Sequence, residues 1–167
     1  MSRSSPVLQF EVKGFHLRDL ASYSPKDRST VVEKVSKIEK RTFPSNEVFD
    51  FITELKKKNT NMILAVNDGD AMELAGYLVY LRTKRLALLH KICVVEQKRE
   101  KGIAKAMIHS LRLHLEKGAC QSIQLWVDEN RKSARALYAS CDFEQIDRCL
   151  DYYGPGRTGL KMQLNIE

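Results

Sequence analysis

The chain has 167 residues, of which 43% are hydrophobic, and this composition suits a single globular domain spanning residues 1–167. Its 28 Lys and Arg against 21 Asp and Glu give a formal net charge of +7, but the basic residues are spread along the chain and form no nucleic-acid-binding motif, so nucleic acid is not the expected partner. No segment approaches the roughly 18 consecutive apolar residues of a membrane span, and the N-terminal residues do not resemble a signal peptide, which predicts a protein of the cytoplasm or the nucleus.

The cysteines do not indicate a metal site. They form no CxxC pair and do not follow the spacing of a zinc finger. We therefore expect free thiols and no metal, and the four residues concerned are Cys93, Cys120, Cys141 and Cys149.

The first half of the chain is expected to form a strand, two helices and a hairpin. Alternating hydrophobicity predicts a strand over residues 7–17. Residues 24–43 have the apolar spacing of a helix that begins with a serine followed by a proline. A second helix is expected in residues 43–59, after a break at Pro44 and with Ser45 as its cap, and residues 61–83 form a hairpin around the turn NDGD.

The second half is expected to form a strand, a helix, a strand, a short helix and two closing strands. The first strand has too many consecutive apolar residues for a surface position and is therefore central. Gly118 stops the first helix, and Asn130 caps the second. This order predicts a mixed α/β or α+β sandwich with helices on both faces of one sheet. The expected elements are residues 85–95, 102–117, 121–127, 130–141, 142–150 and 158–166, with the loop DYYGPGR between the last two.

The segment QKREKGIAKAMI, between the central strand and the next helix, has an unusual charge pattern. Arg99, Lys101 and Lys105 lie where the helix dipole already concentrates positive charge, and no acidic residue occupies the first turn. Gly102 lets the backbone approach a bulky ligand, and Ala104 keeps the first turn small. The segment predicts an anion site, with an ordinary turn carrying solvated lysines as the alternative. It matches neither the P-loop nor the dinucleotide-binding fingerprint.

Two segments together resemble the paired signature of the GNAT superfamily of N-acetyltransferases. They are ICVVEQKREKGIAKAMI and LWVDENRKSARALYASCDF, which match the forms R/Q-x-x-G-x-G/A and N-x-x-A-x-x-L-Y-x-x-x-G-F. IEKRTFPSNEVF and DYYGPGRTGLKMQL are similar to the branch that acetylates protein N-termini, of the ribosomal-protein alanine acetyltransferase type. Arg131 departs from the usual Asn, and Asp142 departs from the usual Gly. The matching positions are Arg99, Gly102 and Ala104 in the first form and Ala134, Leu137, Tyr138 and Phe143 in the second.

The resemblance implies a mostly antiparallel mixed sheet with a splayed central parallel pair and helices on both faces. It also implies acetyl-CoA as the co-substrate, with the pyrophosphate at the glycine turn and the pantetheine along the central strand. Val94 is the expected N–H donor to the thioester carbonyl. The cofactor-binding residues that it implies are Ile92, Cys93, Val94, Arg99, Glu100, Lys101, Gly102, Ile103, Ala104, Lys105, Asn130, Arg131 and Tyr138.

The catalytic acid and base follow from the same resemblance. Tyr138 is the expected general acid, because a phenol with a reference pKa of about 10 can protonate a leaving thiolate. Trp126 stands where relatives often carry Glu or His, and an indole cannot accept a proton. His90 is the candidate base in its place, with Glu47 or no dedicated base as alternatives.

The acceptor site is expected to involve Phe43, Glu47, Tyr152 and Tyr153. The predicted reaction is direct attack of a primary amine on acetyl-CoA, the amine being a protein N-terminus or a lysine. One alternative acceptor is a small amine, either an arylalkylamine or a polyamine. Another alternative is a non-catalytic acyl-CoA sensor, because Trp126 replaces the base that an enzyme of this family often carries. The protein is expected to be a monomer or a weak dimer.

Overall fold

The computed structural model describes residues 12–166, and its seven strands form one sheet in the order β1-β2-β3-β4-β5-β7-β6. Every neighbouring pair is antiparallel except β4 and β5, which run parallel, as expected for the central pair. The strands are β1 (Phe15–Asp19), β2 (Thr60–Asn67), β3 (Asp70–Arg82), β4 (Leu86–Val94), β5 (Ser122–Asp128), β6 (Glu144–Gly154) and β7 (Arg157–Asn165).

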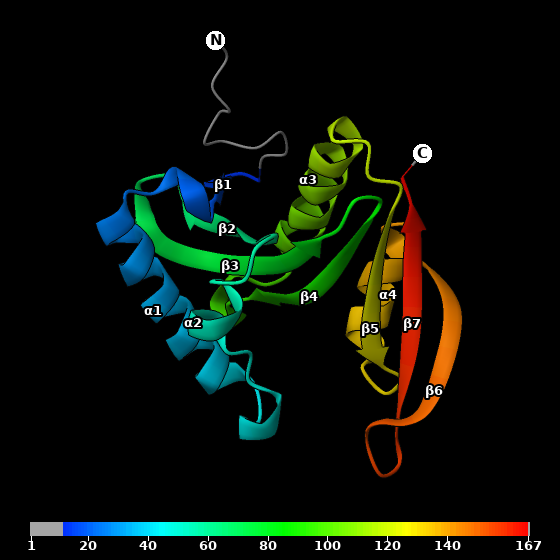
Figure 1. The fold of residues 1–167 in the computed structure, drawn as a ribbon. Helices are drawn as coiled ribbons and strands as arrows, with labels where there is room; N and C mark the ends of the chain where they lie inside the picture. The colour runs from blue at the N-terminus through cyan, green and yellow to red at the C-terminus, as the bar shows by residue number, and fades with distance from the viewer. Residues whose placement is uncertain (1–11, 167) are drawn as a thin grey trace.

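The parallel pair is joined over only three positions. Leu86, Ala87 and Leu88 of β4 pair with residues 122–124 of β5, and beyond them the two strands diverge (Figure 1). The sheet is therefore split into one lobe built on β1–β4 and another built on β5, β7 and β6.

The helices cover both faces of this sheet. In Figure 1, α1 and α2 lie on one side of β2–β4, whereas α3 crosses their other side and α4 packs behind β5 and β7. Two buried clusters result, one between α1 and the sheet and the other joining α3, α4 and both lobes. The helices are α1 (Pro25–Thr42), α2 (Phe51–Glu54), α3 (Ile103–Lys117) and α4 (Lys132–Ser140), with 3-10 turns η1 (Leu20–Ser22), η2 (Ser45–Glu47) and η3 (Glu96–Lys98).

The start of α1 and the end of α3 follow the sequence signals. The Ser24 hydroxyl accepts a hydrogen bond from the Asp27 N–H at 3.2 Å, and Pro25 occupies the first turn, where no N–H donor is needed. α3 ends at Gly118, which caps it as expected. The turn after α4 is also well formed, because Asp142, at φ 71°, adopts the left-handed conformation that the turn requires.

The prediction of one long second helix in residues 43–59, after Pro44, is wrong. The segment contains only the turn η2 and the single-turn helix α2, which starts after Asp50, whose side chain accepts from the Thr53 N–H. Ser45 caps nothing, since η2 follows Pro44 without a side-chain cap. The chain leaves the helical path because the Phe49 N–H donates to a buried carboxylate of α1 instead of to a helical carbonyl.

Three further boundaries differ from the expectation. Asn130 does not cap α4, which begins after Arg131 and has no side-chain cap. The two tyrosines expected in a loop lie in β6, which continues to Gly154 through an irregularity that includes Asp151 at φ 58°. β1 begins at Phe15 rather than at residue 7, and the part of the predicted strand before residue 12 lies outside the described residues. Within residues 12–166, no helix has the length and hydropathy needed to cross a membrane.

Candidate active site

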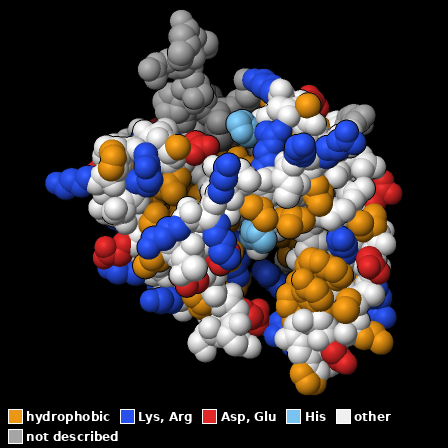
Figure 2. All heavy atoms as spheres, viewed as in Figure 1, with side chains coloured by type: hydrophobic (Ala, Val, Ile, Leu, Met, Phe, Trp, Pro, Cys, Tyr) orange, Lys and Arg blue, Asp and Glu red, His pale blue; other side chains and the backbone are white. Residues whose placement is uncertain are grey.

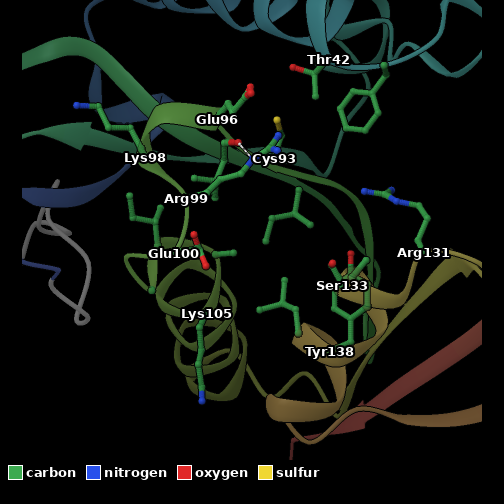
Figure 3. A pocket seen from close by; sticks show the side chains of 18 of the residues that line it. Thr42, Cys93, Glu96, Lys98, Arg99, Glu100, Lys105, Arg131, Ser133 and Tyr138 are labelled. Atoms are coloured by element: carbon green, nitrogen blue, oxygen red, sulfur yellow. Dashed lines mark hydrogen bonds between the residues drawn. The ribbon is translucent and has the colours of Figure 1, made fainter.

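A cleft of about 980 Å³ opens where β4 and β5 diverge (Figure 3). Figure 3 shows Arg99, Glu100 and Lys105 on the α3 side and Arg131, Ser133 and Tyr138 on the α4 side. The lining residues come from the end of α1, from β4, from the turn before α3 and from α4: Thr42, Phe43, Pro44, Glu47, Ile92, Cys93, Val94, Glu96, Lys98, Arg99, Glu100, Gly102, Ile103, Ala104, Lys105, Arg131, Ser133, Ala134, Leu137 and Tyr138.

The end of β4 presents backbone groups to this cleft. The Val95 N–H donates to Ala75 O of β3 at 2.8 Å, and peptide groups alternate in direction along a strand. The Val94 N–H is therefore directed away from β3, toward the gap left by β5. The Val94 carbonyl points the same way, since it accepts a hydrogen bond from Arg99 Nε at 3.0 Å. This unpaired edge can accommodate an extended, amide-containing chain.

The N-terminus of α3 faces the same cleft and is suited to bind an anion. Gly102 precedes the helix at φ 84°, and a Cβ at this position would meet no atom within 4 Å. The first turn contains no acidic residue, and the first helical N–H with a backbone partner is that of Ala106. The N–H groups of residues 103–105 thus remain for a ligand, and Lys105 adds positive charge beside them.

Tyr138 forms part of the opposite wall. Its side chain is 7% exposed and packs against the ring of Phe143, with the centroids 5.8 Å apart. Burial raises the pKa of Tyr138 to about 12, although the nearby Arg131 charge lowers it. The phenol is therefore protonated at neutral pH and can act only as a proton donor.

The two lobes are bridged at one end of the cleft by Arg157, at the start of β7. Its Nη1 lies 3.0 Å from the Glu47 carboxylate, and its Nη2 lies 3.0 Å from the Asp128 carboxylate at the end of β5. Asp128 is 7% exposed and also accepts from the Asn130 N–H, so its pKa is lowered by that backbone hydrogen bond and by Arg157. Sequence reasoning missed both Arg157 and Asp128, because no local pattern indicates a pairing between lobes.

Aromatic side chains continue this surface beyond the cleft. Trp126 stacks on Tyr152 with ring centroids 4.2 Å apart, and Tyr152 contacts Tyr153 edge to face at 4.9 Å. Tyr152 lies directly over Gly159, where a Cβ would come within 2.8 Å of its ring. Burial is the main cause of the raised pKa of Tyr153, and Asp128 also contributes.

His90 is the extra residue of a bulge in β4, since Val79 pairs with Lys91 and Tyr80 pairs with Leu89. Its ring lies 6.0 Å from the ring of Phe49 and is solvent-exposed. Neighbouring protein atoms lower the pKa of His90, and the Glu54 charge acts in the opposite direction. The imidazole is therefore neutral near pH 7, as a base requires, but it does not line the cleft.

The cleft brings together most of the site residues predicted from the sequence. The predicted residues that line it are Phe43, Glu47, Ile92, Cys93, Val94, Arg99, Glu100, Gly102, Ile103, Ala104, Lys105, Arg131 and Tyr138. Those that lie outside its lining are His90, Lys101, Asn130, Tyr152 and Tyr153.

Comparison with known proteins gives a family match and many structural neighbours. The sequence model of the family described as "Acetyltransferase (GNAT) family" matches residues 30–143. The comparison with curated proteins finds no match.

Three of the similar solved structures align with almost the whole of this chain. The ribosomal-protein-S18-alanine N-acetyltransferase of Escherichia coli has a TM-score of 0.74 and 20% identity, covering 92% of this chain and 94% of its own. NAA60 of Arabidopsis thaliana, in complex with acetyl-CoA, has a TM-score of 0.74 and 20% identity, with coverages of 91% and 98%. An aminoglycoside 6'-N-acetyltransferase complexed with coenzyme A has a TM-score of 0.75 and 15% identity, with coverages of 90% and 97%. At these identities the likeness establishes the fold.

Proposed function

The chain belongs to the GNAT family of acetyl-CoA-dependent N-acetyltransferases, and on this basis we propose that its acceptor is a polypeptide amine, either an N-terminal α-amine or a lysine side chain. The observation that carries this proposal is the surface that continues beyond the cleft. Buried Leu125 and Val127 face the core, so Trp126 between them faces the other side of the sheet, where it stacks with the 44%-exposed Tyr152. Figure 2 shows a hollow between the lobes with hydrophobic side chains along one wall. A hollow with an apolar wall and a stacked aromatic pair beyond it suits an extended peptide better than a compact polar amine.

The protein groups in the cofactor half of the proposed site are chemically complementary to acetyl-CoA. N–H groups at the start of α3 and the surrounding cations match a pyrophosphate, and the open edge of β4 matches the pantetheine amides. Bound acetyl-CoA supplies an acetyl group activated as a thioester. In the proposed mechanism the Val94 N–H donates to the carbonyl oxygen, which stabilises the negative charge that develops there when the amine attacks. Tyr138 then donates its proton to the departing thiolate.

The acceptor half of the proposed site consists of Phe43, Glu47, Tyr152 and Tyr153, with Arg157 between the lobes. We assign the removal of the ammonium proton to solvent or to His90, whose neutral imidazole lies outside the cleft lining and would act through water. Trp126 leaves the usual base position without a proton acceptor. The attacking amine is accordingly expected to reach the cleft after deprotonation, so the rate should rise with pH until the amine itself is neutral.

A panel of amines tests the proposed acceptor. Coenzyme A thiol release is measured with a peptide that has a free N-terminus, with its N-acetylated form containing an internal lysine, with spermidine and with an arylalkylamine. We expect turnover with at least one peptide at kcat/KM about tenfold or more above the small amines, because only a peptide is long enough to contact both the cleft and the aromatic pair beyond it. Turnover with small amines alone would assign the enzyme to the small-amine class. Stabilisation by acetyl-CoA without turnover of any amine would favour the acyl-CoA sensor.

The bridge between the lobes provides a second test. Replacing Arg157 with Met should raise the peptide KM about tenfold, because Glu47 loses the contact that holds its loop toward β5 and β7. The melting-temperature increase caused by acetyl-CoA should be unchanged. Arg148→Met is the matched control, since Arg148 forms an exposed two-point pair with Glu129 on the same sheet but outside the cleft. Equal peptide KM values for the two variants would remove Arg157 from the acceptor site.

A further inference from the structure

A carboxylate is buried beneath the loop that forms the acceptor side of the cleft. Glu39, in the last part of α1, is fully shielded from solvent, with 0% exposure. It accepts hydrogen bonds from the Tyr77 hydroxyl of β3 and from the Phe49 N–H, the latter at 2.9 Å. Its Oε2 also lies 3.0 Å from Lys91 Nζ of β4. A single carboxylate therefore ties α1, the following loop and two central strands together.

Lys91 extends this connection to two residues that line the cleft. Its side chain is 16% exposed, and its Nζ lies 3.3 Å from the Glu47 carbonyl oxygen and 3.6 Å from the centroid of the Phe43 ring. An ammonium group has three N–H donors and no acceptor, and here it faces one carboxylate, one carbonyl and one aromatic face. Lys91 is thus fully occupied as a donor and is placed to hold its neighbours rather than to take a proton.

Stability does not explain why a charged pair occupies this position. Taking two charges out of water is costly, and well-packed apolar residues of similar size often support a fold equally well or better. The pair gives directional contacts that apolar side chains lack. Glu39 fixes one end of the loop 43–49 through the Phe49 N–H, and Lys91 fixes its start and middle through Phe43 and Glu47.

We propose that Glu39 and Lys91 are a positioning pair that holds the loop 43–49 at a set distance from β4 and thereby determines acceptor binding. Lys91 directly precedes Ile92, Cys93 and Val94, the part of β4 that lines the cleft. The same strand therefore positions both the acceptor loop and the backbone proposed to polarise the thioester. This inference rests on the proposed function, in which Phe43 and Glu47 contact the acceptor.

A double variant separates positioning from stability. Glu39→Gln with Lys91→Met removes both charges, and the Gln oxygen can accept from the Phe49 N–H while its NH2 faces the Tyr77 hydroxyl oxygen. The melting temperature should therefore stay within a few degrees of the wild-type value, whereas Lys91→Met alone should lower it clearly. The acetyl-CoA-induced shift of the double variant should also be retained. Its peptide KM should nevertheless rise at least tenfold. The control is Glu33→Gln with Lys37→Met, which removes an exposed pair of the same helix and should change neither quantity.

The result that overturns the proposal is a folded double variant with the wild-type peptide KM. Should that protein fail to fold, Lys91→Met alone removes the contacts to Phe43 and Glu47 while Glu39 keeps its bonds from Tyr77 and Phe49, and a wild-type peptide KM in this variant is equally decisive. Hydrogen exchange gives a readout that does not depend on the acceptor. Amides of residues 43–49 should exchange at least tenfold faster in the variant while those of β3 keep their rates, and unchanged exchange in the loop refutes the pair's role. Absence of peptide turnover in the wild-type protein would instead refute the proposed function.

Discussion

Replacing Gly102 with Asp is expected to abolish the stabilisation of the protein by acetyl-CoA. A carboxylate at this position would stand at the start of α3, where the pyrophosphate is proposed to bind, and its charge would repel the phosphates in a cleft partly shielded from water. We expect the Kd for acetyl-CoA to rise at least about thirtyfold, which corresponds to ~2 kcal/mol. Thermal unfolding with and without the ligand measures this effect.

Gly102→Asn is the matched control for that experiment. Asn and Asp have nearly the same shape and both tolerate the left-handed conformation found here at φ 84° better than other side chains. The Asp carboxylate interacts favourably with the helix dipole, so the ligand-free Asp variant should unfold at a temperature equal to or above that of the Asn variant. The Asp carboxylate is thus expected to stabilise the ligand-free protein and to weaken its binding of acetyl-CoA. If both variants bound acetyl-CoA equally, the α3 terminus would not be the phosphate site.

Tyr138→Phe is expected to lower kcat about a hundredfold, the usual range for loss of a positioned general acid. The ring is buried against Phe143, and the substitution keeps that contact, so the melting temperature and the acetyl-CoA-induced shift should remain close to the wild-type values. The KM for either substrate should change little, because the hydroxyl is proposed to act only when the thiolate departs. Steady-state kinetics at saturating acetyl-CoA provide the measurement.

The pH dependence of the same variant distinguishes a proton donor from a packing residue. Burial raises the pKa of Tyr138 to about 12, so the wild-type rate should not fall from loss of this proton at any pH up to about 10. The hundredfold deficit of the Phe variant should be constant over this range. A Phe variant with normal kcat, or a deficit confined to KM, would assign proton donation to another group or to water.

Local sequence signals predicted most of the secondary structure. The serine and proline at the start of α1 and Gly118 at the end of α3 act within one turn of chain, so sequence alone reveals them. The long helix expected in residues 43–59, after Pro44, does not form, for a long-range reason. Its apolar spacing is helical, but Glu39, ten residues before Phe49, captures the Phe49 N–H and redirects the chain. Tertiary contacts of this kind override local preference.

For the candidate site too, local motifs could be recognised in the sequence, whereas long-range contacts could not. Arg99, Gly102 and Ala104 occupy one short motif, so the sequence could group them, and all three line one cleft in the structure. The contacts of Lys91 and Arg157 were not predictable, because each joins residues far apart in the chain. The position of His90 depends on a bulge that shifts the register of β4, and strand periodicity contains no sign of it.

The divergence of β4 from β5 also has a consequence for self-association of the protein without bound cofactor. Beyond Leu88, one side of β4 presents peptide groups that no strand within residues 12–166 covers, which amounts to a sheet edge located inside the molecule rather than at its margin. Natural sheets protect such edges, because an unpaired edge recruits extended segments and promotes aggregation. Bound coenzyme would occupy this edge in place of the absent strand. The cofactor would then serve as a reversible gatekeeper against self-association, and the enzyme would be most soluble when it is supplied with its substrate.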